Sequence, residues 1–188
     1  MNIVLQYLVM KRYSRNIEQK KELIYNAFME LVNEVGYERL TTRNIAKKAN
    51  ISIGTVYHHF GEGKAAIAAG LYERNLGRQM DYLKTDIRTQ VTEHLKLHRE
   101  YKELYRAFDQ AIYARADIFK EIKRKRDQSV SVELEGMEIS HDTFTRMNAT
   151  LDAIVHRHLF IEPLFDSDEE LIDYLLHILG AAYSYKQT

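Results

Sequence analysis

The segment from residue 41 to residue 64 restricts the possible folds of this chain more than any other. Its first part, Thr-Thr-Arg-Asn-Ile-Ala-Lys-Lys-Ala, places Ile45, Ala46 and Ala49 on one helical face. Thr42 is expected to cap this helix, because a threonine oxygen can accept a hydrogen bond from a backbone N–H one turn further on. The pattern predicts a first short helix that ends before Asn50.

A second short helix is predicted directly after this break. Ser52 is its expected N-cap, and Val56, Tyr57 and Phe60 recur at helical spacing. The polar residues between them are expected to face away from the core: Thr55, His58 and His59. Gly54 costs about 1 kcal/mol relative to alanine inside a helix, so its presence suggests that a partner approaches the backbone closely.

Two short helices joined by a tight turn form a helix-turn-helix. The second helix of such a unit fits the major groove of DNA, where each base pair presents a distinct pattern of donors and acceptors. The alternative is a short helical hairpin on the surface that binds no ligand. The polar start of the second helix argues against it, because core packing does not require those residues.

Charge is distributed in a way that agrees with this interpretation. The whole chain is neutral, with 27 basic and 27 acidic residues. Residues 39–64 nevertheless carry five basic residues against one acidic residue, Glu62, a local balance of +4; the basic residues are Arg39, Arg43, Lys47, Lys48 and Lys64. Counterion release at phosphates responds to local charge, so a neutral chain can bind DNA through one basic face.

The composition predicts an all-α chain. Its 188 residues contain one proline, eight glycines and no cysteine, which favours long helices and excludes disulfides and thiolate chemistry. A helix is predicted over residues 24–35, ending at Gly36 as a left-handed C-cap. Ser167 and Glu170 form a predicted capping box after Pro163. The further helices are expected at 64–79, 81–97, 101–114, 117–135, 141–161 and 167–185.

The order of these motifs resembles the DNA-binding domain of the TetR family of transcriptional regulators. The family's order begins with an amphipathic helix, which is followed by Leu-Thr-Thr-Arg-Asn-Ile-Ala-Lys-Lys-Ala. Next come Ile-Gly-Thr-Val-Tyr-His-His-Phe and then a lysine. The resemblance covers about residues 17 to 75. The link from Gly61 to Lys64 is one residue longer than is usual in the family. The resemblance implies an N-terminal three-helix DNA-binding domain and a larger helical ligand-binding and dimerisation domain, with predicted ranges 1–16 (extension), 17–64 and 65–188.

The resemblance also implies roles for individual residues toward double-stranded DNA. Thr42 and Lys64 would contact phosphates at the starts of their helices, and Tyr57 and His58 would contact the backbone beside the groove. Base edges would face Arg43, Ile53, Gly54 and Thr55. The implied protein is a cytoplasmic homodimeric repressor that a small molecule releases from a palindromic operator.

The later helices carry the predicted dimer and effector surfaces. The last two helices are apolar over more than one face, which predicts a four-helix bundle between two subunits through Leu151, Ile154, Val155, Leu171, Leu175, Ile178, Leu179 and Ala182. Internal core is the alternative for these residues.

A pocket for a moderately hydrophobic effector would be lined by Tyr82, Tyr101, Tyr105, Phe108, Tyr113, Phe119 and Met137. Aromatic stripes of this kind more often fill a core.

Other classes of function fit the sequence less well. No glycine-rich phosphate loop or nucleophile elbow occurs, so no enzyme activity and no cofactor are predicted. The pairs His94/His98 and His156/His158 lack a matching carboxylate motif, so no metal site is predicted. A helical protein-interaction adaptor without specific DNA binding is the remaining alternative.

The apolar run at residues 1–10 is too short to span a membrane. The basic residues after it, Lys11, Arg12 and Arg15, could form a DNA-contacting arm or a solvated tail.

Overall fold

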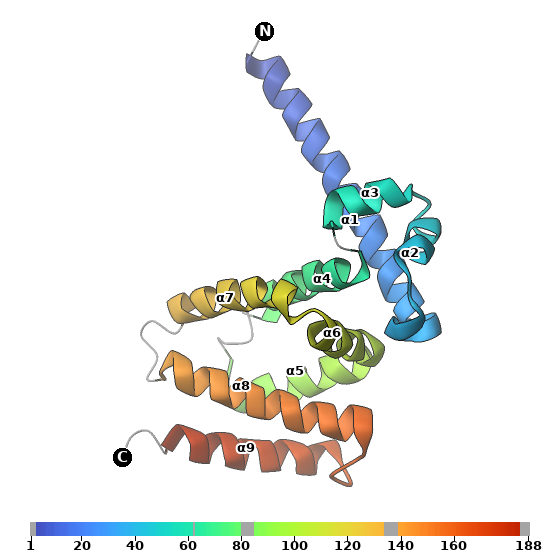
Figure 1. Ribbon diagram of the computed structural model, residues 1–188. Coiled ribbons are helices and arrows are strands. Elements are labelled where there is room, and N and C mark those ends of the chain that lie inside the picture. The colour runs from blue at the N-terminus through green and yellow to red at the C-terminus, as the bar shows by residue number, and fades with distance from the viewer. Residues whose placement is uncertain (1–2, 62, 80–84, 134–138, 185–188) are drawn as a thin grey trace. The chain divides into compact units, whose positions relative to one another are not determined.

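The computed structural model describes the backbone of residues 3–61, 63–79, 85–133 and 139–184, and in these ranges it forms helices joined by short loops, without a strand (Figure 1). Side chains are described for residues 16–61, 63–75, 85–124 and 139–182. The chain divides into two compact units. One comprises Met1–Tyr72 and Ala107–Ile118, and the other comprises Glu73–Arg106 and Phe119–Thr188. The predicted all-α class is confirmed, whereas the domain boundary at residue 64 stays a prediction.

The first unit contains a three-helix arrangement followed by the start of a fourth helix. Its elements are α1 (Ile3–Arg39), α2 (Thr42–Lys48), α3 (Ile53–Phe60) and the first part of α4 (Lys64–Gln79). Ile24, Ala27, Phe28, Leu31 and Val32 form a buried apolar stripe along α1, with Phe28 fully buried. Every element contributes to one core, whose fully buried members include Ile24, Phe28, Ile45, Val56, Ile67 and Leu71. Burial of this apolar surface fixes how α2 and α3 lie on α1.

The N-cap residues of α2 and α3 can be compared directly with those predicted from the sequence. Thr41, not Thr42, caps α2: its backbone is extended, and its hydroxyl accepts from the Asn44 N–H at 3.1 Å. Thr42 is therefore the first residue of the helix, and the prediction was wrong by one position. The predicted cap of α3 is confirmed, since the Ser52 hydroxyl accepts from the Thr55 N–H at 3.0 Å.

Four described positions of this unit lie at positive φ: Gly36, Asn50, Gly61 and Gly63. Gly36 has φ 75° and kinks α1 within its last turn rather than ending the helix. Asn50 has φ 52°, a conformation that asparagine tolerates better than most residues, and it turns the chain between α2 and α3.

The second unit has its core where α5 (Ile87–Glu100), α8 (His141–His156) and α9 (Asp168–Ser184) pack together. The helices α8 and α9 lie side by side (Figure 1). The buried residues of this core are Val91, Leu95, Leu151, Val155, Leu171, Ile172, Leu175 and Leu179. The remaining elements are α6 (Lys102–Ala114), α7 (Ala116–Glu133) and a π-helical turn, η2 (Arg157–Ile161), that continues α8. Both α6 and α7 are shared between the two units.

Helix starts in this unit are set by side-chain caps. The capping box at α9 is present: the Ser167 hydroxyl accepts from the Glu170 N–H at 3.2 Å, and the Glu170 carboxylate accepts from the Asp166 N–H at 3.0 Å. The expected start of a helix at residue 81 was wrong. Asp86 instead caps α5 by accepting from the Thr89 N–H at 3.0 Å, so the helix begins at Ile87. Among the described residues, no helix combines the length and apolarity needed to cross a bilayer.

Candidate DNA interface

The first turn of α3 is exposed, capped and anchored from behind. Val56 is fully buried and attaches α3 to the core, while Ile53 is 40% exposed and Gly54 is exposed. The Ser52 hydroxyl accepts from the Thr55 N–H and lies 2.9 Å from the Thr55 hydroxyl. A methyl group added at Gly54 would meet nothing nearer than that Ser52 hydroxyl, at 3.7 Å, so the backbone here is open to an approaching partner.

The remaining surface of α3 is more exposed than the sequence predicted. Tyr57 is 48% exposed and therefore does not belong to the buried apolar stripe of α3. That stripe consists of Val56, which is buried, and Phe60, which is half-buried. His58 is exposed, as expected, whereas His59 is half-buried. Burial lowers the pKa of His59, and the nearby charges of His58 and Lys20 lower it further.

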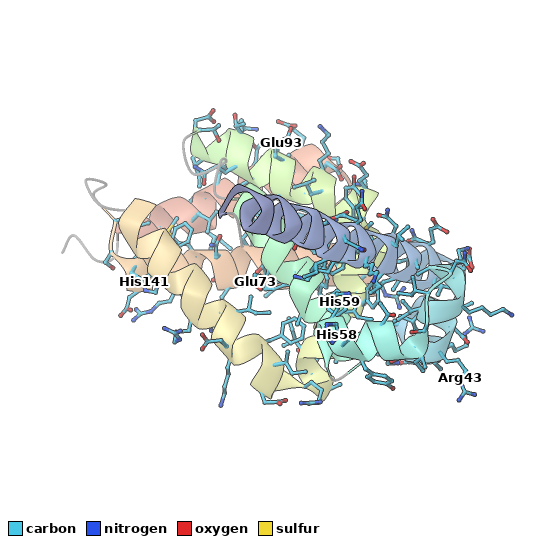
Figure 2. The ribbon with its side chains drawn as sticks, turned by 90° about the horizontal axis from the view of Figure 1, so that it is seen from above. Arg43, His58, His59, Glu73, Glu93 and His141 are labelled. Carbon is cyan, nitrogen blue, oxygen red and sulfur yellow. The ribbon has the colours of Figure 1, made fainter. Side chains whose placement is uncertain are left out.

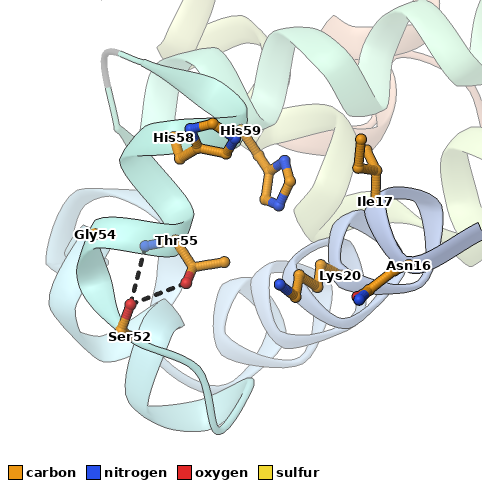
Figure 3. Close-up of a pocket in the computed structure, with 8 residues that line it drawn as sticks. All are labelled: Asn16, Ile17, Lys20, Ser52, Gly54, Thr55, His58 and His59. Carbon is orange, nitrogen blue, oxygen red and sulfur yellow. Dashed lines mark hydrogen bonds between the residues drawn. The ribbon is translucent and has the colours of Figure 1, made fainter. Parts of the chain in front are cut away.

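A polar hollow of about 300 Å³ lies between α3 and α1 (Figure 3). The α1 side is formed by Asn16, Ile17 and Lys20, and the α3 side by Ser52, Gly54, Thr55, His58 and His59. The sequence analysis missed the contribution of α1. The signal was available, because residues 16, 17 and 20 share one helical face next to the buried stripe. Lys20 thus adds a basic side chain beside the first turn of α3.

The basic residues near α2 divide into exposed and paired side chains. Arg43 and Lys47 are exposed, and Figure 2 shows Arg43 at the edge of the molecule. Lys48 instead pairs with Glu34 at 2.7 Å and Glu30 at 3.1 Å, both on α1, and the hydrogen bond to Glu34 raises its pKa. The local charge of +4 read from residues 39–64 is therefore partly neutralised by α1. Arg43, Lys47 and Lys20 remain as the basic groups of this surface.

Lys64 holds the start of α4 on the end of α1. Its ammonium donates to the carbonyl of Tyr37 at 2.8 Å and to that of Glu38 at 3.2 Å, and lies 4.4 Å from the centre of the Tyr37 ring. The C-terminal end of a helix attracts a cation, which stabilises this arrangement. Burial lowers the pKa of Lys64. The sequence predicted a phosphate contact for this ammonium, and such a contact would compete with the two carbonyls.

The long link before α4 is built around a glycine that no other residue can replace without strain. Gly63 has φ 83°, and a methyl group there would lie 2.7 Å from the Thr42 hydroxyl oxygen. The same methyl group would come within 3.9 Å of the Tyr57 ring. The extra residue of the link thus seats Gly63 against the first residue of α2 and against α3.

The residues predicted for an effector pocket lie in different environments. Tyr105 and Phe119 are buried in the second unit, and Phe108 is buried in the first, where its ring packs edge-on against Tyr72 at 5.3 Å. Tyr101 is half-exposed and Tyr113 is 89% exposed, so neither is enclosed in this structure. Tyr82 and Met137 lie outside the described residues, as do the side chains of Lys11, Arg12 and Arg15.

The residues predicted for a dimer interface also separate into two groups. Five of them belong to the core of the second unit, which accounts for their burial within one chain: Leu151, Val155, Leu171, Leu175 and Leu179. Ile154 and Ile178 are half-buried, and Ala182 is exposed. The exposed sides of α8 and α9 also carry Ala149, Ala153, Gly180 and Ala181, small residues that permit close helix packing.

A short capped helix with an exposed first turn, held by a second short helix on a three-helix core, defines a helix-turn-helix protein. The family model described as "Bacterial regulatory proteins, tetR family" matches residues 24–71. Residues 24–71 thus form a DNA-binding domain of the TetR family of transcriptional regulators. Members of this family are DNA-binding transcription factors and not enzymes.

Two curated relatives match part of the chain. The fatty acid metabolism regulator protein of Bacillus subtilis (strain 168) is 31% identical over 74 residues, which is 39% of this chain and 38% of that protein. The tetracycline repressor protein class D of Escherichia coli is 39% identical over 62 residues, which is 33% of this chain and 28% of that protein. The chain thus spans less than two-fifths of the length of these relatives.

Solved structures share the fold over most of the chain. The fatty acid degradation regulator FadR from Bacillus halodurans has a TM-score of 0.64 at 20% identity, covering 85% of this chain and 94% of that one. A TetR transcriptional regulator from Rhodococcus sp. RHA1 has a TM-score of 0.66 at 15% identity, covering 86% and 96%. At these identities the likeness concerns the fold alone.

Proposed function

We propose that this chain is a sequence-specific DNA-binding regulator whose α3 enters the major groove of an operator. The observation that carries the proposal is the exposed first turn of α3, capped by Ser52 and anchored by the buried Val56. A rigid helix with an accessible start is what readout of base edges requires. Arg43, Ile53, Gly54 and Thr55 would face bases, and Thr42, Tyr57 and His58 would contact the backbone.

The surface around α3 supports this assignment. Lys20 supplies positive charge beside the exposed turn, Lys47 is an exposed basic residue of α2, and we add both to the proposed phosphate contacts. We assign Lys64 to positioning instead, because its ammonium is held by the carbonyls of Tyr37 and Glu38. It would set the angle between α4 and the helix-turn-helix.

We further propose that the regulator is a cytoplasmic homodimeric repressor of a palindromic operator. Two recognition helices one helical turn of DNA apart, about 34–36 Å, mirror the two-fold symmetry of such a site. The exposed small residues of α8 and α9 suit a second copy of the same surface, since they permit close approach between helices.

A small apolar molecule is the proposed effector. Relatives named as regulators of fatty acid metabolism and degradation make acyl compounds the first class to test. Binding in the helical second unit would shift α4 and so change the spacing of the recognition helices. If saturating acyl ligand leaves operator affinity unchanged, this class of effector is wrong for the protein.

The decisive experiment is selection of genomic DNA fragments by the purified protein, followed by titration of a selected duplex at two salt concentrations. A protein with six to ten phosphate contacts loses about 10³- to 10⁵-fold in affinity between about 50 and 200 mM salt. We expect a steep loss of this kind and a preference over random DNA. An adaptor that binds only protein would select no sequence and show no specific shift.

A further inference from the structure

Four polar side chains from two helices of the second unit meet at one place. On α5, His94 and His98 are one helical turn apart, and on α8, Asp152 and His156 have the same spacing. Residues at this spacing lie on one face of a helix, so the two packed helices each present a pair. The sequence had grouped His156 with His158, but the His158 ring accepts from the Leu164 N–H at 3.0 Å instead.

The distances within this cluster are short. The Nε2 atom of His94 lies 3.0 Å from a carboxylate oxygen of Asp152. One possible ligand atom each from His94, His98 and Asp152 lie within 4.8 Å of one another. The ring of His156 has its centre 4.9 Å from that of His98. Asp152 is thus the carboxylate that was absent from the sequence pattern, and only folding brings it to the two histidines.

The state of His98 is that of a metal-ligating histidine. Its Nδ1 lies 2.8 Å from the backbone carbonyl of His94, and because a carbonyl can only accept, Nδ1 carries the proton. The Nε2 atom then keeps its lone pair for a ligand. A hydrogen bond from the second ring nitrogen to a carbonyl is the usual outer contact of a histidine that binds a metal.

The surroundings hold the cluster in place and leave it accessible. The ring of His98 stacks between those of His94, at 4.0 Å, and Tyr105, at 3.6 Å, so its orientation is fixed. The Asp152 side chain is 47% exposed, which provides a path from solvent.

We infer that His94, His98 and Asp152 form a binding site for a divalent transition-metal ion such as Zn²⁺ or Ni²⁺. Two imidazoles and one carboxylate suit these ions, whereas Mg²⁺ and Ca²⁺ prefer sites made of oxygen atoms. The prediction of no metal site, made from sequence spacing alone, is replaced by this inference. The site does not depend on the proposed DNA-binding function.

The test is a calorimetric titration of the full chain, stripped with a chelator, with ZnCl₂ and separately with CoCl₂, MgCl₂ and CaCl₂. We expect one Zn²⁺ per chain at this site and visible absorption from bound Co²⁺, without binding of Mg²⁺ or Ca²⁺. Asp152→Asn and His94→Gln should each weaken Zn²⁺ binding at least about tenfold. Glu93→Gln removes a carboxylate on α5 next to His94 and should change nothing.

Several outcomes would overturn the inference. They are no Zn²⁺ binding, equal affinity in Asp152→Asn and Glu93→Gln, or Mg²⁺ binding as tight as that of Zn²⁺. Other histidines of the chain, such as the adjacent pair His58 and His59, could also bind Zn²⁺. Loss of Zn²⁺ binding in the Asp152 variant excludes them as the binding site. Unchanged helical circular dichroism establishes that the variants are folded. The titration contains no DNA, so failure of the proposed regulator function and failure of the metal site are separate results.

Discussion

At the scale of single residues, contacts made inside the fold decide which basic side chains can reach DNA. Lys48 is paired with two glutamates of α1, and Lys64 is held by two carbonyls. Arg43 is exposed, and in the part of the chain that the structure describes it makes no ion pair. Of the residues proposed to face bases, Arg43 has the largest hydrogen-bonding capacity, with five donors. Sequence preference should therefore depend on it more than on its basic neighbours.

Replacing Arg43 with alanine tests this difference. We expect Arg43→Ala to weaken binding to a selected operator by about 1–3 kcal/mol and to relax the preference for that sequence. Fluorescence anisotropy with a selected duplex and a random duplex measures both effects. Lys48→Ala is the matched control, because its charge is already balanced by Glu30 and Glu34. Equal losses of Arg43→Ala on the two duplexes would contradict a role in base readout.

At the scale of helices, the link from α3 to α4 leaves little room for a single added methyl group. Gly63 combines positive φ with a close approach to Thr42 on α2. We expect Gly63→Ala to lower the free energy of unfolding by about 1–3 kcal/mol, because both backbone strain and a steric overlap are introduced. Urea unfolding measures this loss.

The control for this change is another glycine of the same domain. Gly54 lies in α3 with helical backbone and open space around it, so Gly54→Ala should hold or raise stability by up to about 1 kcal/mol. The same variant should bind operator less tightly if the DNA backbone approaches this position closely. Equal destabilisation by both alanines would mean that Gly63 has no special place in the link.

The helices and their caps were largely predictable from sequence, because they depend on local patterns. The buried stripe of α1, the Ser52 cap and the capping box of α9 each involve residues within about one turn. The pairings of Lys48 with α1, of Lys64 with Tyr37 and of His94 with Asp152 join residues 14 to 58 positions apart in the chain. Spacing cannot reveal such partners, so the assignment of Lys64 and the histidine cluster required the fold.

At the scale of the whole molecule, the proposed dimer needs a surface that the core of the second unit leaves exposed. Five leucine and valine residues that were predicted for the dimer interface are instead buried in the core of the second unit. The residues that α8 and α9 leave exposed include four small ones, Ala149, Ala153, Gly180 and Ala181. Such a surface can bring helices into close contact, and a single bulky charge should prevent it.

We expect Ala181→Arg to convert the dimer to a monomer at micromolar concentration, because the added guanidinium would be buried without a partner at a two-fold interface. Sedimentation equilibrium measures the change, and Ala116→Arg, at an exposed alanine where α7 begins, is the control. The monomer should also lose most of its affinity for a palindromic site, since each half-site then binds alone. A variant that remains dimeric with full operator affinity would place the interface on another surface of the chain.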